Sequence, residues 1–176
     1  MEFNKNIKHK IIDNFLKKET YDYFSSFLKS GVVPWYYHPI DTTMGVTKNK
    51  NGFFSFCFYN DYKPDDKSFY EFMPHFIKSL NAKAFIQIRA NLTFRDKDTL
   101  ESAFHIDNFC DTSTTGIFYM TTCNAKTVLK YPKNNIFIES IENRMLLFPT
   151  KMKHKVIYHT DVHKRYVVNF NFFNNN

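Results

Sequence analysis

His105 and Asp107 are the first pair of residues in this chain whose types and spacing could do chemistry. In an extended strand, side chains at positions i and i+2 point to the same face, so an imidazole and a carboxylate would lie side by side. Burying such a pair is unfavourable unless another group pairs with it or binds it. The pair is therefore either two thirds of a metal site or an ordinary polar stretch in a surface turn, and the two residues alone do not decide between them.

A metal site would need a further ligand on a later strand, and three histidines follow: His154, His159 and His163. Between residues 151 and 158, lysines alternate with His154 and apolar residues. Because lysines belong on the outside of a strand, His154 is predicted to point inward. His159 has the parity of the lysines and His163 falls in a turn. His154 is therefore the candidate ligand, with a structural core histidine as the alternative.

The segment 165–173 presents two different faces. Arg165, Val167, Asn169 and Asn171 share one face, and the residues on the other face are apolar or aromatic. An arginine that faces an interior needs an anion, and its planar guanidinium can hold a carboxylate at two points. An internal Asp or Glu could be that anion, but few acids occupy inward strand positions. The polar face is therefore predicted to bind the carboxylate of a ligand.

Two histidines and one carboxylate around a metal would leave coordination positions open. Open positions suit oxygen chemistry on non-haem iron(II), because a 2-oxo acid can take two of them and dioxygen another. Structural zinc sites, by contrast, are closed and favour cysteine. The cysteines of this chain stand at 57, 110 and 123 and form no Cys-x-x-Cys pair, which argues against a zinc knuckle or a disulfide framework.

The elements that must position these side chains begin with an N-terminal support over about 8–81. Apolar residues at helical spacing, prolines and turn residues divide this part of the chain. The elements predicted there are helical structure over 8–30 that breaks near Glu19 and ends at Gly31, a loop over 32–45, a strand over 52–59, and a helix over 63–83 that kinks or breaks at Pro74.

From about 83 to 173, short apolar or alternating runs follow one another between turn residues. This pattern predicts about eight strands, arranged as a double-stranded β-helix, or jelly roll. The N-terminal helices would cover one outer sheet face. The predicted fold class is therefore mostly β with N-terminal helices, α+β, in a single domain over 1–176.

Charge and composition exclude several classes of protein. The formal net charge is +7, which would suit nucleic acid, an acidic membrane surface or an anionic small substrate. No RNP-like run, zinc finger or helix-turn-helix is present, and the four glycines form no nucleotide-binding loop. No signal core or stretch of transmembrane length is found either. The chain is thus expected to be soluble and cytoplasmic, without a membrane or an obligatory protein partner.

Four stretches in order, "FHIDN", "IFYMT", "NRMLLFPTKMKHKV" and "RYVVNFNF", resemble the iron(II)- and 2-oxoglutarate-dependent oxygenases of the prolyl-hydroxylase-like branch. The resemblance covers roughly residues 84–173. It implies iron(II), 2-oxoglutarate and dioxygen as cofactor and cosubstrates, with ascorbate as an optional reductant. The residue roles that it implies are iron ligation by His105, Asp107 and His154, and cosubstrate contacts by Arg165, Tyr119, Asn169 and, as a weaker candidate, Asn91.

The reaction implied is hydroxylation, because relatives that halogenate lack the carboxylate that Asp107 supplies. The usual Gly-Gly-Thr after the tyrosine strand is missing, since the sequence there is "CNAKTV". The class of substrate is therefore undecided between a protein side chain, a free amino acid, a nucleobase and a small metabolite. Two other hypotheses remain, a non-catalytic jelly-roll binding module and a nucleic-acid-binding protein.

Overall fold

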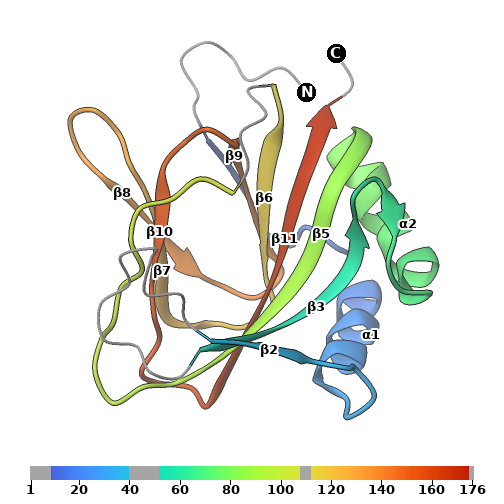
Figure 1. Cartoon of the computed structure of the whole chain (residues 1–176), viewed down its shortest axis with the longest axis horizontal. Coiled ribbons are helices and arrows are strands. Elements are labelled where there is room, and N and C mark those ends of the chain that lie inside the picture. The colour runs from blue at the N-terminus through green and yellow to red at the C-terminus, as the bar shows by residue number, and fades with distance from the viewer. Residues whose placement is uncertain (1–8, 40–51, 108–111, 175–176) are drawn as a thin grey trace.

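The computed structural model describes residues 9–39, 52–107 and 112–174, and its architecture is mostly β with two helices (Figure 1). Eight strands form one sheet in the order β1-β9-β6-β11-β5-β3-β2, with β4 on β3, and all pairs are antiparallel. These strands are β1 (Lys10–Ile12), β2 (Tyr36–His38), β3 (Phe53–Asn60), β4 (Lys63–Pro64), β5 (Ala82–Phe94), β6 (Thr114–Tyr119), β9 (Arg144–Pro149) and β11 (Lys164–Asn174).

A second, smaller sheet has the order β10-β7-β8. Its strands are β7 (Cys123–Leu129), β8 (Ile136–Ser140) and β10 (His154–Ile157). Apolar side chains of the two sheets pack together, among them Ile117, Leu129 and Phe148. The interior that should hold the predicted site therefore lies between two antiparallel sheets.

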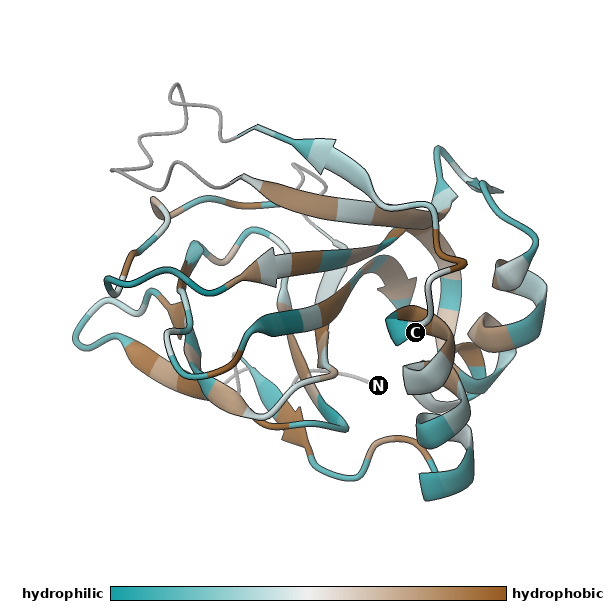
Figure 2. Ribbon diagram, turned by 90° about the horizontal axis from the view of Figure 1, so that it is seen from below, coloured by the Kyte–Doolittle hydropathy of each residue, from teal (hydrophilic) through white to brown (hydrophobic). Residues whose placement is uncertain are grey.

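Two helices, α1 (Lys18–Lys29) and α2 (Ser68–Leu80), cover the outer face of the large sheet (Figures 1 and 2). Their aromatic residues join those of the sheet in one buried cluster, in which the Phe76 ring lies 4.9 Å from Phe170 and 5.1 Å from Phe118. The predicted covering of one sheet face by N-terminal helices is confirmed. Among the described residues, neither helix is long and apolar enough to cross a membrane.

Helix α2 forms within the predicted range but is shorter, Ser68–Leu80, and it does not break at Pro74. Asp66 satisfies the first turn, because its carboxylate accepts hydrogen bonds from the backbone N–H and the hydroxyl of Ser68 (2.8 and 2.6 Å). The helix ends at Asn81, whose left-handed backbone (φ 53°) closes it.

The prediction of helical structure from residue 8 onward was wrong over its first turns. Lys10–Ile12 form β1, which pairs with Met145–Leu147 of β9, and α1 begins only at Lys18. Asn14 adopts a left-handed backbone (φ 51°) between the two elements. Pairing with a distant strand overrides local helical spacing here, as tertiary context often does. The loop predicted over 32–45 also contains a short strand, β2, while residues 40–51 lie outside the described part.

Strand β11 shows how the two faces of the large sheet differ. Tyr166, Val168, Phe170 and Phe172 all point into the cluster beneath the helices. The alternate residues face the other sheet, and each lies opposite an inward residue of β5: Arg165 opposite Thr93, Val167 opposite Asn91, and Asn169 opposite Arg89. The inner face is thus polar where the outer face is aromatic.

Candidate metal centre

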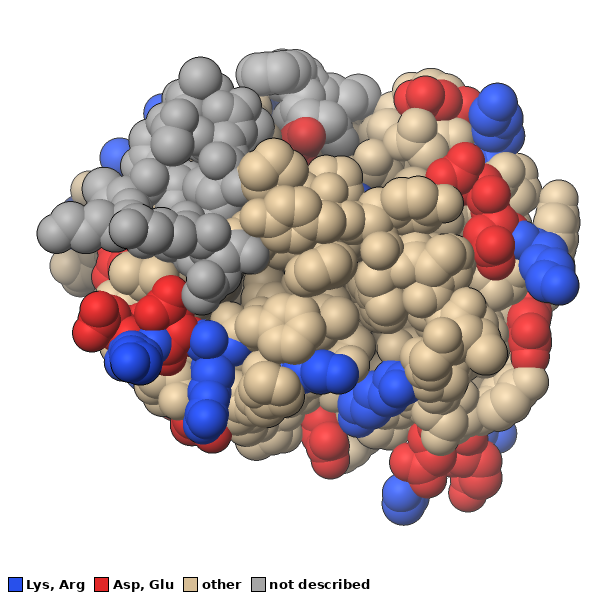
Figure 3. Space-filling view, turned by 60° about the horizontal axis from the view of Figure 1, so that its bottom comes forward, with Lys and Arg blue, Asp and Glu red and all other residues tan. Residues whose placement is uncertain are grey.

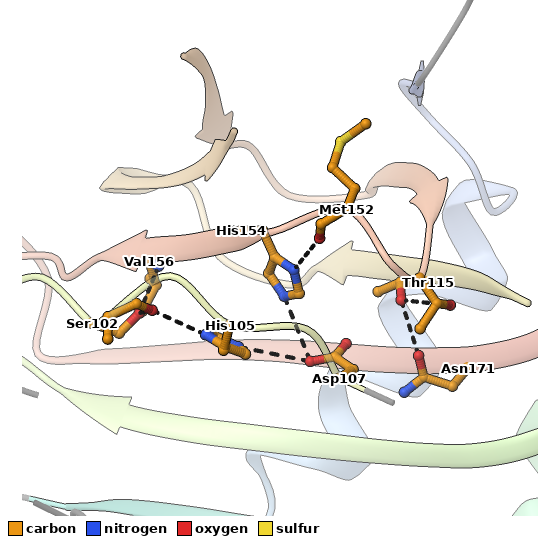
Figure 4. A network of polar contacts seen from close by, with 10 residues as sticks. Ser102, His105, Asp107, Thr115, Met152, His154, Val156 and Asn171 are labelled. Atoms are coloured by element: carbon orange, nitrogen blue, oxygen red, sulfur yellow. Dashed lines mark hydrogen bonds and ion pairs between the residues drawn. The ribbon is translucent and has the colours of Figure 1, made fainter. Parts of the chain in front are cut away.

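The three residues predicted as metal ligands lie together (Figure 4). His105, Asp107 and His154 each offer one ligand atom, and these atoms all lie within 4.8 Å of one another. The Nε2 atoms of His105 and His154 are 3.7 and 3.5 Å from Oδ1 of Asp107. The side chains of Asp107 and His154 are 15% and 6% exposed, whereas that of His105 is 41% exposed. The cluster is therefore accessible from the His105 side.

A backbone bridge between His105 and His154 sets the positions of the two imidazoles. The N–H of each residue donates to the carbonyl of the other at 2.9 Å, and their ring centroids lie 4.5 Å apart. The stretch 103–107 was predicted to be a strand, but within the described residues it forms only this isolated bridge. Nearby, the hydroxyl of Ser102 accepts the N–H of Val156 at 3.0 Å, so a side chain replaces part of the ladder. The irregular backbone pairing between residues 102–105 and β10 therefore sets the orientation of the two imidazoles.

Each imidazole is also held through Nδ1, the ring nitrogen that does not face Asp107. Nδ1 of His105 lies 3.1 Å from the carbonyl oxygen of Ala103, and Nδ1 of His154 lies 3.2 Å from that of Met152. A carbonyl fixes the proton on Nδ1 and leaves the lone pair on Nε2, which is the arrangement of metal-binding histidines. Both Nε2 atoms then point toward Asp107.

The electrostatics of the cluster suit a cation. Burial lowers the pKa of His105, with a contribution from His154, so its imidazole is neutral. Burial alone would raise the pKa of Asp107, but the hydrogen bond to His154 and the nearby positive charges, including Arg89, bring it below its usual value. Oδ2 of Asp107 is buried without a hydrogen-bond partner among the described residues. An ionised carboxylate with an orphaned oxygen, faced by the Nε2 atoms of two imidazoles, fits a divalent metal.

Arg165 lies deeper in the same interior and is 5% exposed. Its Nε donates to the hydroxyl of Ser140 at 3.3 Å, and its guanidinium carbon is 5.9 Å from the centre of the Tyr119 ring. Among the described residues it forms no ion pair with a carboxylate. Tyr119 is fully buried, its O–H donates to Thr127 at 2.7 Å, and burial raises its pKa to about 12. A neutral phenol therefore lies beside a buried cation that lacks an anion.

Comparisons with known proteins bear on the fold. No protein-family model and no curated protein matches the sequence. The structure is similar to a 2OG-Fe(II) oxygenase family oxidoreductase from Burkholderia pseudomallei (TM-score 0.73, 7% identity, 98% of this chain and 88% of that chain). It is also similar to a Pseudomonas putida prolyl-4-hydroxylase (TM-score 0.69, 10% identity, 96% and 93%). A third similar structure is the epimerase SnoN in complex with Fe3+, alpha ketoglutarate and nogalamycin RO (TM-score 0.67, 6% identity, 95% and 79%).

The fold is that of a prolyl-hydroxylase-like oxygenase. This agrees with the resemblance seen in the four sequence stretches. At such low identities the likeness establishes the fold and leaves the reaction to the site, because one fold can carry several chemistries. The similar structures illustrate this, since they include a hydroxylase and an epimerase.

The other two predicted cosubstrate residues face the oxygenase-like interior but lie away from Arg165. Asn169 is four residues further along β11, opposite Ile117 of β6 and Arg89 of β5. Asn91 of β5 lies opposite Val167, and its Oδ1 is buried without a partner among the described residues. The structure therefore brings Arg165 and Tyr119 into contact and spreads the two asparagines along the inner face.

His159 was predicted to share the outward face of the lysines, and this was wrong because its side chain is fully buried. Strand β10 ends at Ile157, so strand parity no longer applies two residues later. Asn124 holds the following turn by hydrogen bonds to Thr160 and Asp161, each 2.9 Å long. Burial, with a smaller effect of Arg165, lowers the pKa of His159 to about 4.

Sequence reasoning also missed Arg89 and Thr93. Both lie on the inner face of β5 at alternate positions with Asn91, and Nε of Arg89 and Oγ1 of Thr93 are buried without partners in the described part of the chain. Parity with Asn91 was the signal that could have found them. Cys57 and Cys123 are free thiols, and Cys110 lies outside the described residues.

Proposed function

We propose that this chain is a non-haem iron(II) dioxygenase that couples decarboxylation of 2-oxoglutarate to hydroxylation of a second molecule. The strands would form the double-stranded β-helix expected from the sequence. The observation that carries the proposal is the convergence of His105, Asp107 and His154 in the same interior as Arg165, a buried cation without a carboxylate partner. A non-catalytic binding module would have no use for this combination.

His105, Asp107 and His154 would hold the metal. The two imidazoles would bind through Nε2, since their Nδ1 atoms are engaged by carbonyls, and the carboxylate would bind through the oxygens that now lack a full set of partners. When bound, iron(II) supplies the activation of dioxygen that the side chains of a protein cannot provide. The residues themselves fix the ligands on one side and leave the opposite side accessible past His105.

Arg165 would bind the distal carboxylate of 2-oxoglutarate. Its position near Tyr119 and Ser140 supports a two-point carboxylate contact, which neutralises the cation and fixes the direction of the cosubstrate. The 2-oxo acid end would then point along the inner face toward the metal ligands. Asn91 and Asn169 line that path and would supply further hydrogen bonds.

The substrate class stays open between a protein side chain, an amino acid, a nucleobase and a small metabolite. The positive net charge alone does not favour nucleic acid. On the face shown in Figure 3, basic and acidic side chains both lie around the rim, and the centre is uncharged. Nucleic-acid binding would need basic residues gathered along one track.

The proposal is tested by succinate release from 2-oxoglutarate with iron(II) and ascorbate, measured against a panel drawn from the four substrate classes. We expect succinate that depends on both metal and 2-oxoglutarate, and that is lost in His105→Ala. His75→Ala is the matched control, because this exposed histidine lies on α2, away from the inner face. Failure of the wild-type protein to bind 2-oxoglutarate with metal present, or equal turnover in both variants, would overturn the proposal.

A further inference from the structure

Arg89 is a second arginine of the interior for which the proposed reaction has no use. It lies on the inner face of β5, opposite Asn169 on one side and Cys57 of β3 on the other. Because it faces the second sheet, it shares the interior in which His154 of β10 is buried. The residue is half-buried, and its guanidinium is therefore accessible from that space.

Among the described residues, none supplies the anion that the partly desolvated guanidinium of Arg89 needs. Its Nε is buried without a hydrogen-bond partner, and it forms no ion pair with any carboxylate of residues 9–39, 52–107 or 112–174. Leaving the Nε atom of Arg89 unpaired is unfavourable, whereas a bound anion would satisfy it.

Arg165 and Arg89 contact aromatic rings on opposite sides of the interior. Arg165 contacts Tyr119 of β6, whereas the guanidinium of Arg89 lies 5.9 Å from the centre of the Phe53 ring on β3. Strands β6 and β3 are separated by β11 and β5, so the two contacts are three strand spacings apart, about 14 Å. A five-carbon dicarboxylate held by Arg165 and the metal is too short to reach Phe53 as well. Arg89 is thus left beyond the reach of a cosubstrate bound at Arg165.

Next to Arg89, side chains of β2 and β3 form a surface that is suited to contact with a ligand. His38 of β2 stacks on Phe53, with ring centroids 5.0 Å apart, and its Nε2 lies 2.7 Å from the hydroxyl of Ser55. Phe53 is only partly buried. An aromatic surface and a cation therefore lie together at the β2–β3 side of the interior.

We infer that Arg89 binds an oxyanion of the primary substrate, a carboxylate or a phosphate, at the β2–β3 side of the interior, beyond the reach of a cosubstrate bound at Arg165. The inference rests on the proposed function, because it assumes the metal at His105, Asp107 and His154 and the cosubstrate at Arg165. It narrows the substrate to an anionic molecule or to an anionic residue of a larger one. Neutral molecules would leave the Arg89 guanidinium desolvated and unpaired.

The test uses manganese(II) in place of iron, with 2-oxoglutarate present, so that no turnover occurs. Three fluorinated probes are titrated: 4-fluorobenzoate, 4-fluorophenyl phosphate and neutral 4-fluorobenzamide. We expect manganese to enhance the fluorine relaxation of at least one anion in a saturable manner, and not that of the amide. Comparison of the benzoate with the phosphate then identifies the preferred anion.

Two variants that remove the same charge decide whether Arg89 is responsible. Arg89→Gln should weaken binding of the anionic probe by roughly tenfold or more, and Arg95→Gln, at an exposed position after the same strand, should leave it unchanged. Arg89→Lys keeps the charge and should retain part of the binding. A melting curve for each variant shows that it folds.

The inference is overturned if neither anion is relaxed, if Arg89→Gln binds the probe as the wild type does, or if Arg89→Gln weakens 2-oxoglutarate as much as Arg165→Gln does. The last result would make Arg89 part of the cosubstrate pocket. Manganese binding and 2-oxoglutarate affinity are measured first, by electron paramagnetic resonance and calorimetry. If either fails, the proposed function is wrong, and Arg89 is then judged by the fluorine chemical shifts of the same probes.

Discussion

The two faces of the large sheet are built from the same strands, but they differ in the kind of side chain that they bury. The outer face is a dry cluster of aromatic rings beneath α1 and α2, in which Phe118, Phe170 and Phe172 are fully buried. The inner face carries Arg89, Asn91 and Thr93 with buried polar atoms that lack partners in the described part of the chain. Apolar burial stabilises the fold, and unpaired polar atoms destabilise it. The outer face therefore supports an inner face that is arranged for binding.

The largest effect should follow from Asp107→Ala, which removes the carboxylate of the metal cluster. We expect 2-oxoglutarate turnover to be abolished, because two histidines alone hold a divalent metal poorly. The free energy of unfolding without metal should stay the same or rise, since a buried oxygen without a partner disappears. Succinate release and urea unfolding measure the two. Full turnover would refute the metal site, and loss of folding would assign Asp107 a structural role.

The outer face should respond in the opposite way. Phe170→Ala removes a fully buried ring that packs on Phe76, and it should lower the free energy of unfolding by about 3–5 kcal/mol. Asn169→Ala, one residue away on the inner face, is the matched control and should cost less than about 1 kcal/mol. Urea unfolding of both variants checks the comparison. Equal losses would mean that the two faces contribute alike to stability.

A smaller effect is expected for Arg165→Lys in the inner pocket. The substitution keeps the charge but loses the planar fork, so the affinity for 2-oxoglutarate should drop by roughly 1.5–3 kcal/mol. Calorimetry with metal present measures the change, and Arg165→Ala gives the limit for loss of the charge. Unchanged affinity in both variants would make Arg165 structural and remove the second support of the dioxygenase proposal.

The smallest effect concerns pH and His159. Burial lowers the pKa of this histidine from 6.5 to about 4, so the folded state holds it neutral while the unfolded state protonates it near 6.5. Its contribution to stability is therefore complete above pH 6.5 and is lost as the pH falls toward 4. Urea unfolding at pH 7 and at about pH 4.5 should show a smaller drop in His159→Gln than in the wild type. Parallel drops would show that His159 is not involved.

Rules that use only neighbouring residues predicted much of this chain, because the alternation of side chains between the two faces of a strand is a local property. The alternation in 165–172 separated the aromatic face from the polar face, and the parity of His154 in 151–158 pointed it inward, where it lies. Helix α2 followed from its apolar spacing. The order of the four oxygenase-like stretches indicated the fold that the structural comparisons support.

Only the tertiary structure decided the features that depend on distant segments. Lys10–Ile12 became a strand because an edge of β9 was available, and His159 was buried because its loop is tied to Asn124 of β7. The pairing of His105 with His154, and the separation of Arg89 from Arg165, likewise come from contacts between residues far apart in the chain. A sequence states which side of a strand each residue takes. It does not state which strands become neighbours, because that choice is made by the burial and hydrogen bonding of the whole chain at once.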